Sequence, residues 1–196
     1  MIKVTIILFF ITLLNVNSNF KGNIENANKL EIPNSENNIY SKGKLVNNKK
    51  DLLFVVSHNQ SPNIVIYQAN RQQNGSLNTK KPVDVFWLLI NKGDIIEDLN
   101  LLEWKLAYGF KIIPVIEGEK YKIKLNAIKD KIIIINKKAD GKVESQMLIN
   151  GKFSILKEVF INYEESFYLP QVKYLDFRGI DLNSGKNVSE RLIVNK

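Results

Sequence analysis

The sequence predicts an all-β protein of about ten strands and one short helix. Two observations favour this class. Short apolar or alternating runs follow one another from Leu52 almost to the end of the chain, and glycine-containing turn dipeptides separate many of them. Neither an internal repeat nor a strand–helix–strand pattern is present. Because a twisted sheet of this many strands usually closes or folds into two layers, we expect an antiparallel β-barrel or a two-layer β-sandwich with hairpin connections.

The turn dipeptides set the strand boundaries, because their residues accept the backbone angles of tight hairpins. They are Asn74-Gly75, Lys92-Gly93, Glu117-Gly118, Asp140-Gly141, Asn150-Gly151 and Ser184-Gly185. The clearest is Asn150-Gly151, where both residues readily adopt positive φ angles. The predicted strands are 52–57, 63–69, 83–90, 110–116, 120–125, 131–135, 143–149, 153–162, 172–177 and 188–194.

The single predicted helix covers residues 101–108 and has recognisable ends. Asn100 is a suitable N-cap, Glu103 can reach back to the Asn100 amide, and Gly109 ends the helix. A helix this short is not stable in isolation, so apolar side chains must dock it onto the sheet. The side chains expected to do so are Leu102, Trp104 and Leu106.

The N-terminus has the character of a secretory signal. Residues 1–18 contain one cation, Lys3, then an apolar run, then small residues near a cleavage position. The run is shorter than the ~20 residues that span a bilayer, so we expect no transmembrane anchor after cleavage. Residues 19–50 are polar and should form a flexible leader, and residues 51–196 a single β domain. The protein is therefore expected to be exported, either to the periplasm or to the exterior.

Composition excludes several kinds of chemistry. The chain has no cysteine, which rules out a lipoprotein anchor, disulfides, thiolate catalysis and cysteine zinc sites. The formal charge is +8, from 28 basic and 20 acidic residues. Such an excess attracts anionic polymers. The lysines are spread along the chain, however, so the sequence does not indicate a dedicated basic patch. Since export also removes intracellular nucleic acid, we expect no nucleic-acid partner.

The only histidine, His58, follows an apolar strand within Ser57-His58-Asn59. The functional interpretation makes it a general base in a hydrolase. Asp84 or Asp176 would orient it, and Ser57 or Ser61 would be the nucleophile. No glycine-flanked serine motif is present, and adjacent strand residues point to opposite faces, which favours a solvated residue at a strand end. We assign no catalytic residue, no metal ligand and no cofactor.

Asp84 is unusual, because it shares a strand face with Phe86 and Leu88. A carboxylate on an apolar face is costly unless a cation meets it. We therefore expect Asp84 to be partly buried and to pair with an arginine, with Arg178 as the first choice. The pair could be structural or functional.

Aromatic residues supply the candidate ligand site. Core packing is their simplest role, and a cleft that stacks on a sugar ring or holds an apolar ligand is the functional alternative. The residues predicted to bind are Tyr67, Asp84, Trp87, Trp104, Tyr108 and Arg178.

Four segments carry a family resemblance: LFVVSHNQSPNIVIYQAN, PVDVFWLL, LEWKLAYGF and SGKNVSERL. Together they resemble a family of exported bacterial proteins known as domain of unknown function 4833. The resemblance implies an exported, mostly β domain and no established activity. We expect non-catalytic binding of a small ligand, or of an envelope glycan or lipid, through an aromatic-lined cleft. An envelope hydrolase using Asp84, His58 and an arginine, or a structural assembly partner, are alternatives, and the oligomeric state is open.

Overall fold

The computed structural model describes residues 51–128, 130–165 and 171–194. The strands in chain order are β1 (Leu52–His58), β2 (Ile64–Ala69), β3 (Val83–Leu89), β4 (Ile95–Asp98), β5 (Phe110–Ile116), β6 (Lys120–Leu125), β7 (Ile133–Lys137), β8 (Val143–Ile149), β9 (Lys152–Glu164), β10 (Gln171–Asp181) and β11 (Asn187–Ile193). Short helical segments are η1 (Ile90–Lys92), α2 (Leu101–Glu103) and η2 (Trp104–Tyr108). The predicted all-β class with one short helix is confirmed. The predicted signal peptide and leader lie outside the described residues.

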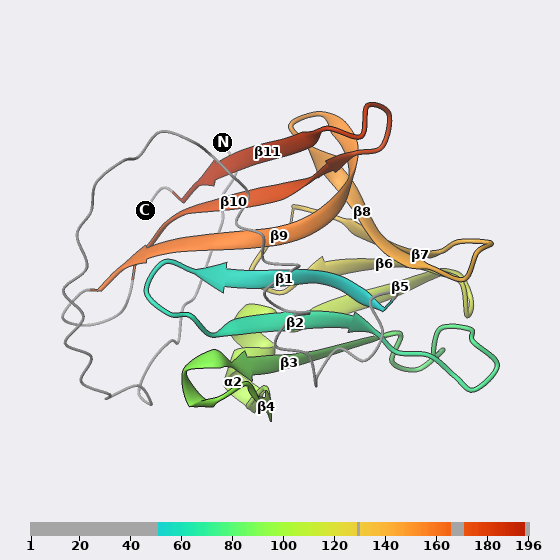
Figure 1. The fold of residues 1–196 in the computed structure, drawn as a ribbon, viewed down its shortest axis with the longest axis horizontal. Helices are drawn as coiled ribbons and strands as arrows, with labels where there is room; N and C mark the ends of the chain where they lie inside the picture. The colour runs from blue at the N-terminus through green and yellow to red at the C-terminus, as the bar shows by residue number, and fades with distance from the viewer. Residues whose placement is uncertain (1–50, 129, 166–170, 195–196) are drawn as a thin grey trace.

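The strands form one curled sheet, a half-barrel, with the order β4-β3-β2-β1-β9-β8-β7-β6-β5 (Figure 1). The long strand β9 is the branch point. Its start pairs with β8, its later residues pair with β1, and its other edge pairs with β10, which in turn pairs with β11. Because β8 and β1 share one edge of β9, the sheet divides there into two wings, β1–β4 and β5–β8. The core lies between them.

One pairing was not predicted. β1 and β9 run parallel, from Val55 opposite Glu158 to His58 opposite Ile161, so the sheet is mixed and not purely antiparallel. Turn dipeptides specify pairs of consecutive strands, whereas this pair joins segments far apart in the sequence. The short strand β4 was also missed, because its four residues are all exposed and show no alternation of burial.

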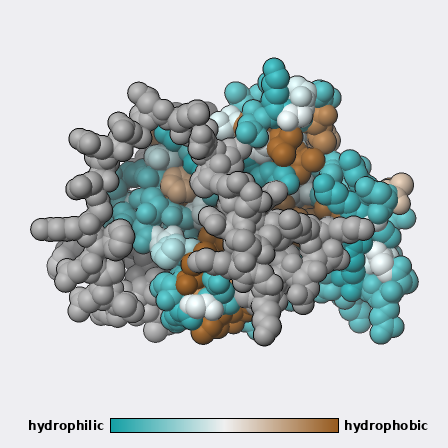
Figure 2. Space-filling model, viewed as in Figure 1, coloured by the Kyte–Doolittle hydropathy of each residue, from teal (hydrophilic) through white to brown (hydrophobic). Residues whose placement is uncertain are grey.

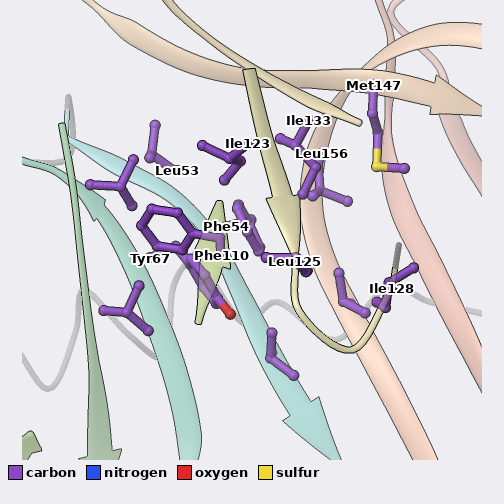
Figure 3. Close-up of a cluster of buried hydrophobic side chains, with 14 of the residues drawn as sticks. Leu53, Phe54, Tyr67, Phe110, Ile123, Leu125, Ile128, Ile133, Met147 and Leu156 are labelled. Atoms are coloured by element: carbon purple, nitrogen blue, oxygen red, sulfur yellow. The ribbon is translucent and has the colours of Figure 1, made fainter. Parts of the chain in front are cut away.

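The core contains large apolar side chains from both wings. Figure 3 shows Phe54 and Tyr67 together, and their rings stack with centroids 4.2 Å apart. Ile123 and Ile133, both fully buried, come from β6 and β7. Each such side chain contributes about 1.5–3 kcal/mol when removed from water. On the side seen in Figure 2, hydrophilic residues cover most of the described surface, with apolar patches between them.

Local turn chemistry behaves as expected at the β8–β9 hairpin. Asn150 has φ 49° and Gly151 has φ 75°. Two consecutive positive φ angles are the signature of the tight turn that matches strand twist. The predicted hairpin is confirmed.

The predicted helix has the expected start and an unexpected interior. The Asn100 side chain accepts hydrogen bonds from the amides of Leu102 and Glu103, and the Glu103 carboxylate accepts from the Asn100 amide at 2.9 Å, so the capping box is confirmed. After Glu103 the helix widens into the π-helical turn η2, closed by the bond from the Gly109 amide to the Trp104 carbonyl.

The exposure of the helical side chains shows which of them dock the helix onto the sheet. Leu102 is 52% exposed, so its predicted docking role is wrong. Trp104, also predicted to dock, packs against the core, as does Ala107, and Tyr108 is buried. Leu106, the third predicted residue, is half-buried. A Cβ at Gly109 would lie 2.1 Å from the Trp104 carbonyl oxygen, which explains the glycine that ends the turn.

Candidate functional site

The aromatic cluster lies on the inner face of the sheet and consists of His58, Tyr67, Trp87, Tyr108 and Tyr163. Strand alternation puts His58, Tyr67 and Trp87 on the same face of three neighbouring strands. The η2 turn adds Tyr108, whose ring meets that of Trp87 edge to face with centroids 5.2 Å apart. The His58 ring lies 6.2 Å from that of Tyr163. The cluster therefore joins β1, β2, β3, β9 and η2.

Hydrogen bonds fix the polar atoms of the cluster. The Tyr67 hydroxyl donates to the Tyr108 carbonyl at 2.6 Å, and the Tyr108 hydroxyl lies 2.9 Å from Nε2 of His58. Burial lowers the pKa of His58 to about 4, opposed by a hydrogen bond to the Asn63 backbone. Burial also raises the pKa of Tyr108 well above its ordinary value. Both groups are uncharged at neutral pH. His58 ends β1, as predicted, but it is only partly exposed and its ring contacts Tyr108 and Trp87, so the expectation of a solvated side chain is wrong.

An apolar cavity of about 40 Å³ lies beside the cluster. The η2 turn forms one wall through Leu106, Ala107 and Tyr108, and Tyr67 lies on the sheet side. The other lining residues are Val56, Leu125, Ala127, Ile128, Val159, Ile161, Val172 and Leu175. None of them carries a charge. The space therefore offers a guest apolar contacts and no ion pair.

The structure brings together some of the predicted binding residues. Tyr67 and Tyr108 line the cavity, and Trp87 contacts Tyr108. Trp104 lies on the same helical turn, but its ring packs against Phe110 at 5.3 Å and does not line the cavity.

Asp84 and Arg178 are elsewhere, and their predicted pairing is wrong. The Asp84 carboxylate lies 2.8 Å from Nζ of Lys81, and its side chain is 37% exposed. Arg178 pairs with Glu158 at 3.0 Å, directly across the β9–β10 ladder. Since Asp84 begins β3 and Arg178 lies on β10, three strands, β2, β1 and β9, separate them. The cation that pairs with Asp84 is Lys81, which lies just before β3.

All three arginines bind other carboxylates. Arg71 pairs with Asp51, and Arg178 with Glu158. Arg191 donates to Asp176 through Nε at 2.7 Å and Nη2 at 2.8 Å. This hydrogen bonding with Arg191 lowers the pKa of Asp176 despite its burial. These ion pairs give the arginines a structural role on the sheet.

The three groups of the hydrolase alternative do not converge. Asp84 on β3 pairs with Gln68 on β2, and Gln68 pairs with Leu52 on β1. Leu52 and His58 are six positions apart along β1. At about 3.3 Å per residue this separates them by about 20 Å. Arg178 faces Glu158 and Ser57 hydrogen-bonds Glu158, so both lie on the sheet face opposite His58.

Sequence reasoning missed the contribution of β9 to this site. Val159, Ile161 and Tyr163 alternate along that strand and face inward, the first two into the cavity. Their period-two spacing was a usable signal. What the sequence did not reveal was the parallel partner, β1, that brings them next to His58.

The fold and site define a half-barrel β domain with a buried aromatic cluster and a small apolar cavity. The model of the family described as Domain of unknown function (DUF4833) matches residues 54–191, which include the whole site. The chain belongs to this family. Searches of curated proteins and of solved structures found no match. Within the described ranges, no helix has the length and apolar character needed to cross a membrane.

Proposed function

We propose that this protein is a non-catalytic binding domain for a small, uncharged apolar group, held between the η2 turn and the inner face of the sheet. The observation that carries the proposal is the cavity itself, which is bounded by Tyr67 and Tyr108 and lined without any charge. Apolar cavities stay dry and bind apolar guests. A guest would replace missing van der Waals contacts at little desolvation cost.

Size and chemistry narrow the class of ligand. A small cavity lined by apolar side chains suits a branched hydrocarbon end or the tip of an acyl chain, whereas the hydroxyls of a sugar ring would lose their water there without gaining partners. The hydroxyl of Tyr67 is already used on the Tyr108 carbonyl. An envelope lipid fits this site better than a glycan, and the export signal predicted at residues 1–18 would bring the protein to such lipids.

The protonation properties of the cluster support binding over catalysis. A general acid or base works best with a pKa near the operating pH. Burial moves the pKa of His58 down to about 4 and that of Tyr108 up. Neither group is suited to proton transfer at neutral pH.

A cavity-filling variant tests the proposal. Ala107→Leu puts three more carbon atoms into the cavity wall, whereas Ala139→Leu makes the same change at an exposed turn and is the matched control. Methyl NMR spectra of the full chain would be recorded under xenon pressure, then with 1-butanol, isoprenol and glucose. We expect xenon and the apolar alcohols to shift the methyl signals of Val56, Ile128 and Leu175 in the parent and in Ala139→Leu.

In Ala107→Leu these shifts should disappear while the melting temperature holds or rises, as in other cavity-filling changes. Glucose should have no effect on any of the proteins. Two results would contradict the proposal: an absence of xenon shifts in the parent, or shifts that persist in Ala107→Leu.

A further inference from the structure

The outer face of the β5–β6 hairpin carries an unusual combination of cations and exposed apolar side chains. We call it the lysine face and define it by Lys111, Ile113 and Ile116 on β5 with Lys120, Lys122 and Lys124 on β6. Tyr121, Ile123 and Leu125 point into the core, so the three lysines that alternate with them on β6 point outward. Lys111, Ile113 and Ile116 lie directly opposite these lysines across the strand pair and share their side, with a bulge between Pro114 and Ile116. The lysine face is on the opposite side of the sheet from the cavity.

The charges on the lysine face are uncompensated. Lys111 lies directly opposite Lys124 across the strand pair, and like charges in that position destabilise a sheet. Among the described residues, none of the four lysines forms an ion pair with a carboxylate. β5, β6 and β7 contain no acidic residue. Glu144, on the next strand, is already bound by Lys138 and Lys142.

Edge protection explains only part of this composition. β5 pairs only with β6 within the described part of the chain, and a lysine and a proline commonly block such an edge. Lys111 and Pro114 are enough for that purpose. Ile113 and Ile116, which lie opposite Lys122 and Lys120, are nevertheless 48% and 52% exposed. Protection of an edge calls for fewer exposed apolar side chains, so these two residues need another explanation.

We propose that the lysine face binds the surface of an anionic lipid bilayer. Lysines near an anionic membrane are attracted to its headgroups, and apolar side chains beside them enter the boundary between headgroups and acyl chains. Four unpaired lysines supply the first interaction, and Ile113 with Ile116 supplies the second. A soluble anionic polymer would contact the lysines alone, so the two exposed apolar residues favour a bilayer over such a polymer as the partner. This binding site is independent of the cavity and of the function proposed for it.

Vesicle binding of the full chain tests the assignment. One set of vesicles contains phosphatidylcholine only, and the other contains equal parts of phosphatidylcholine and phosphatidylglycerol. The neutral vesicles measure whatever binding the apolar N-terminal run contributes, which is common to all variants. The charge variant is Lys122→Gln with Lys124→Gln, and its control, Lys92→Gln with Lys186→Gln, makes the same change in net charge elsewhere on the surface.

We expect the parent to prefer the anionic vesicles and the charge variant to lose roughly 30-fold in partition coefficient, at about five-fold per lysine. The control should lose much less. A third variant, Ile113→Ser with Ile116→Ser, keeps the charge and should also weaken binding. Melting temperatures would confirm that each variant is folded.

Three outcomes would overturn the proposal. Equal binding of the parent to both kinds of vesicle would show no anionic preference. Equal losses in the charge variant and its control would indicate net charge alone and not this face. Unchanged binding of the serine variant would remove the argument for a bilayer and point to a soluble anionic polymer.

Discussion

His58 should make the stability of the fold depend on pH in a range where no other side chain of ordinary pKa titrates, because it is the only histidine. Burial lowers its pKa in the folded protein from an ordinary 6.5 to about 4. Between these values the unfolded chain binds a proton that the folded protein does not. The free energy of unfolding therefore falls as the pH is lowered through 6.5, and the loss from this group ends near pH 4.

The size of the effect follows from the shift. The unfolded chain takes up the proton below about pH 6.5, so lowering the pH from 8 to 5 includes about 1.5 pH units in which only the unfolded chain is protonated. At about 1.4 kcal/mol per unit, His58 should lower the free energy of unfolding by about 2 kcal/mol. His58→Gln removes this group. At pH 8 the variant should be less stable than the parent, since the imidazole ring no longer packs against Trp87 and Tyr163. From pH 8 to pH 5, however, the free energy of unfolding of the variant should fall by about 2 kcal/mol less than that of the parent.

Urea denaturation of both proteins at half-unit pH steps measures this difference. Carboxylates that titrate near pH 5 are present in both proteins, so their contribution cancels in the comparison. NMR titration of the single imidazole provides a direct check, and its pKa should fall below 5. Parallel stability profiles for parent and variant, or an imidazole pKa near 6.5, would show that His58 is solvated and that the aromatic cluster is wrongly described.

Two further substitutions test the local structure. Asn100→Ala should lower the free energy of unfolding by about 1 kcal/mol, because two amides lose their acceptor; an unchanged urea midpoint would show that the cap contributes nothing. Asp84→Asn should change the stability by less than about 1 kcal/mol, since its partner Lys81 is 59% exposed. A loss of several kcal/mol in that variant would indicate a buried ion pair of the kind first expected from the sequence.

Local features of this protein were predictable from the sequence. The predicted ranges 110–116, 120–125 and 143–149 agree with β5, β6 and β8. The Asn150-Gly151 turn and the capping box at Asn100 were predicted too. These features depend on residues within a few positions of one another, so their energetics are contained in a short stretch of chain.

The site was less predictable. Tyr67, Trp87 and Tyr108 were recognised as members of an aromatic set, but their contacts were not. The burial of His58 was missed, and Asp84 was assigned the wrong partner. The contacts of His58 join segments that are far apart in the sequence, so they depend on the arrangement of the strands and of η2. The partner of Asp84 is local, because Lys81 precedes it by three residues, and the search for a distant arginine overlooked it.

The sequence by itself determined where the strands and turns fall, because alternation and turn chemistry act locally. Only the tertiary structure decided that β1 lies parallel to β9 and that η2 closes over the inner face of the sheet. These two arrangements create the cavity and bury His58. They result from packing both faces of a curled sheet at once, a condition that involves residues distributed over the whole domain and leaves no pattern within any one segment.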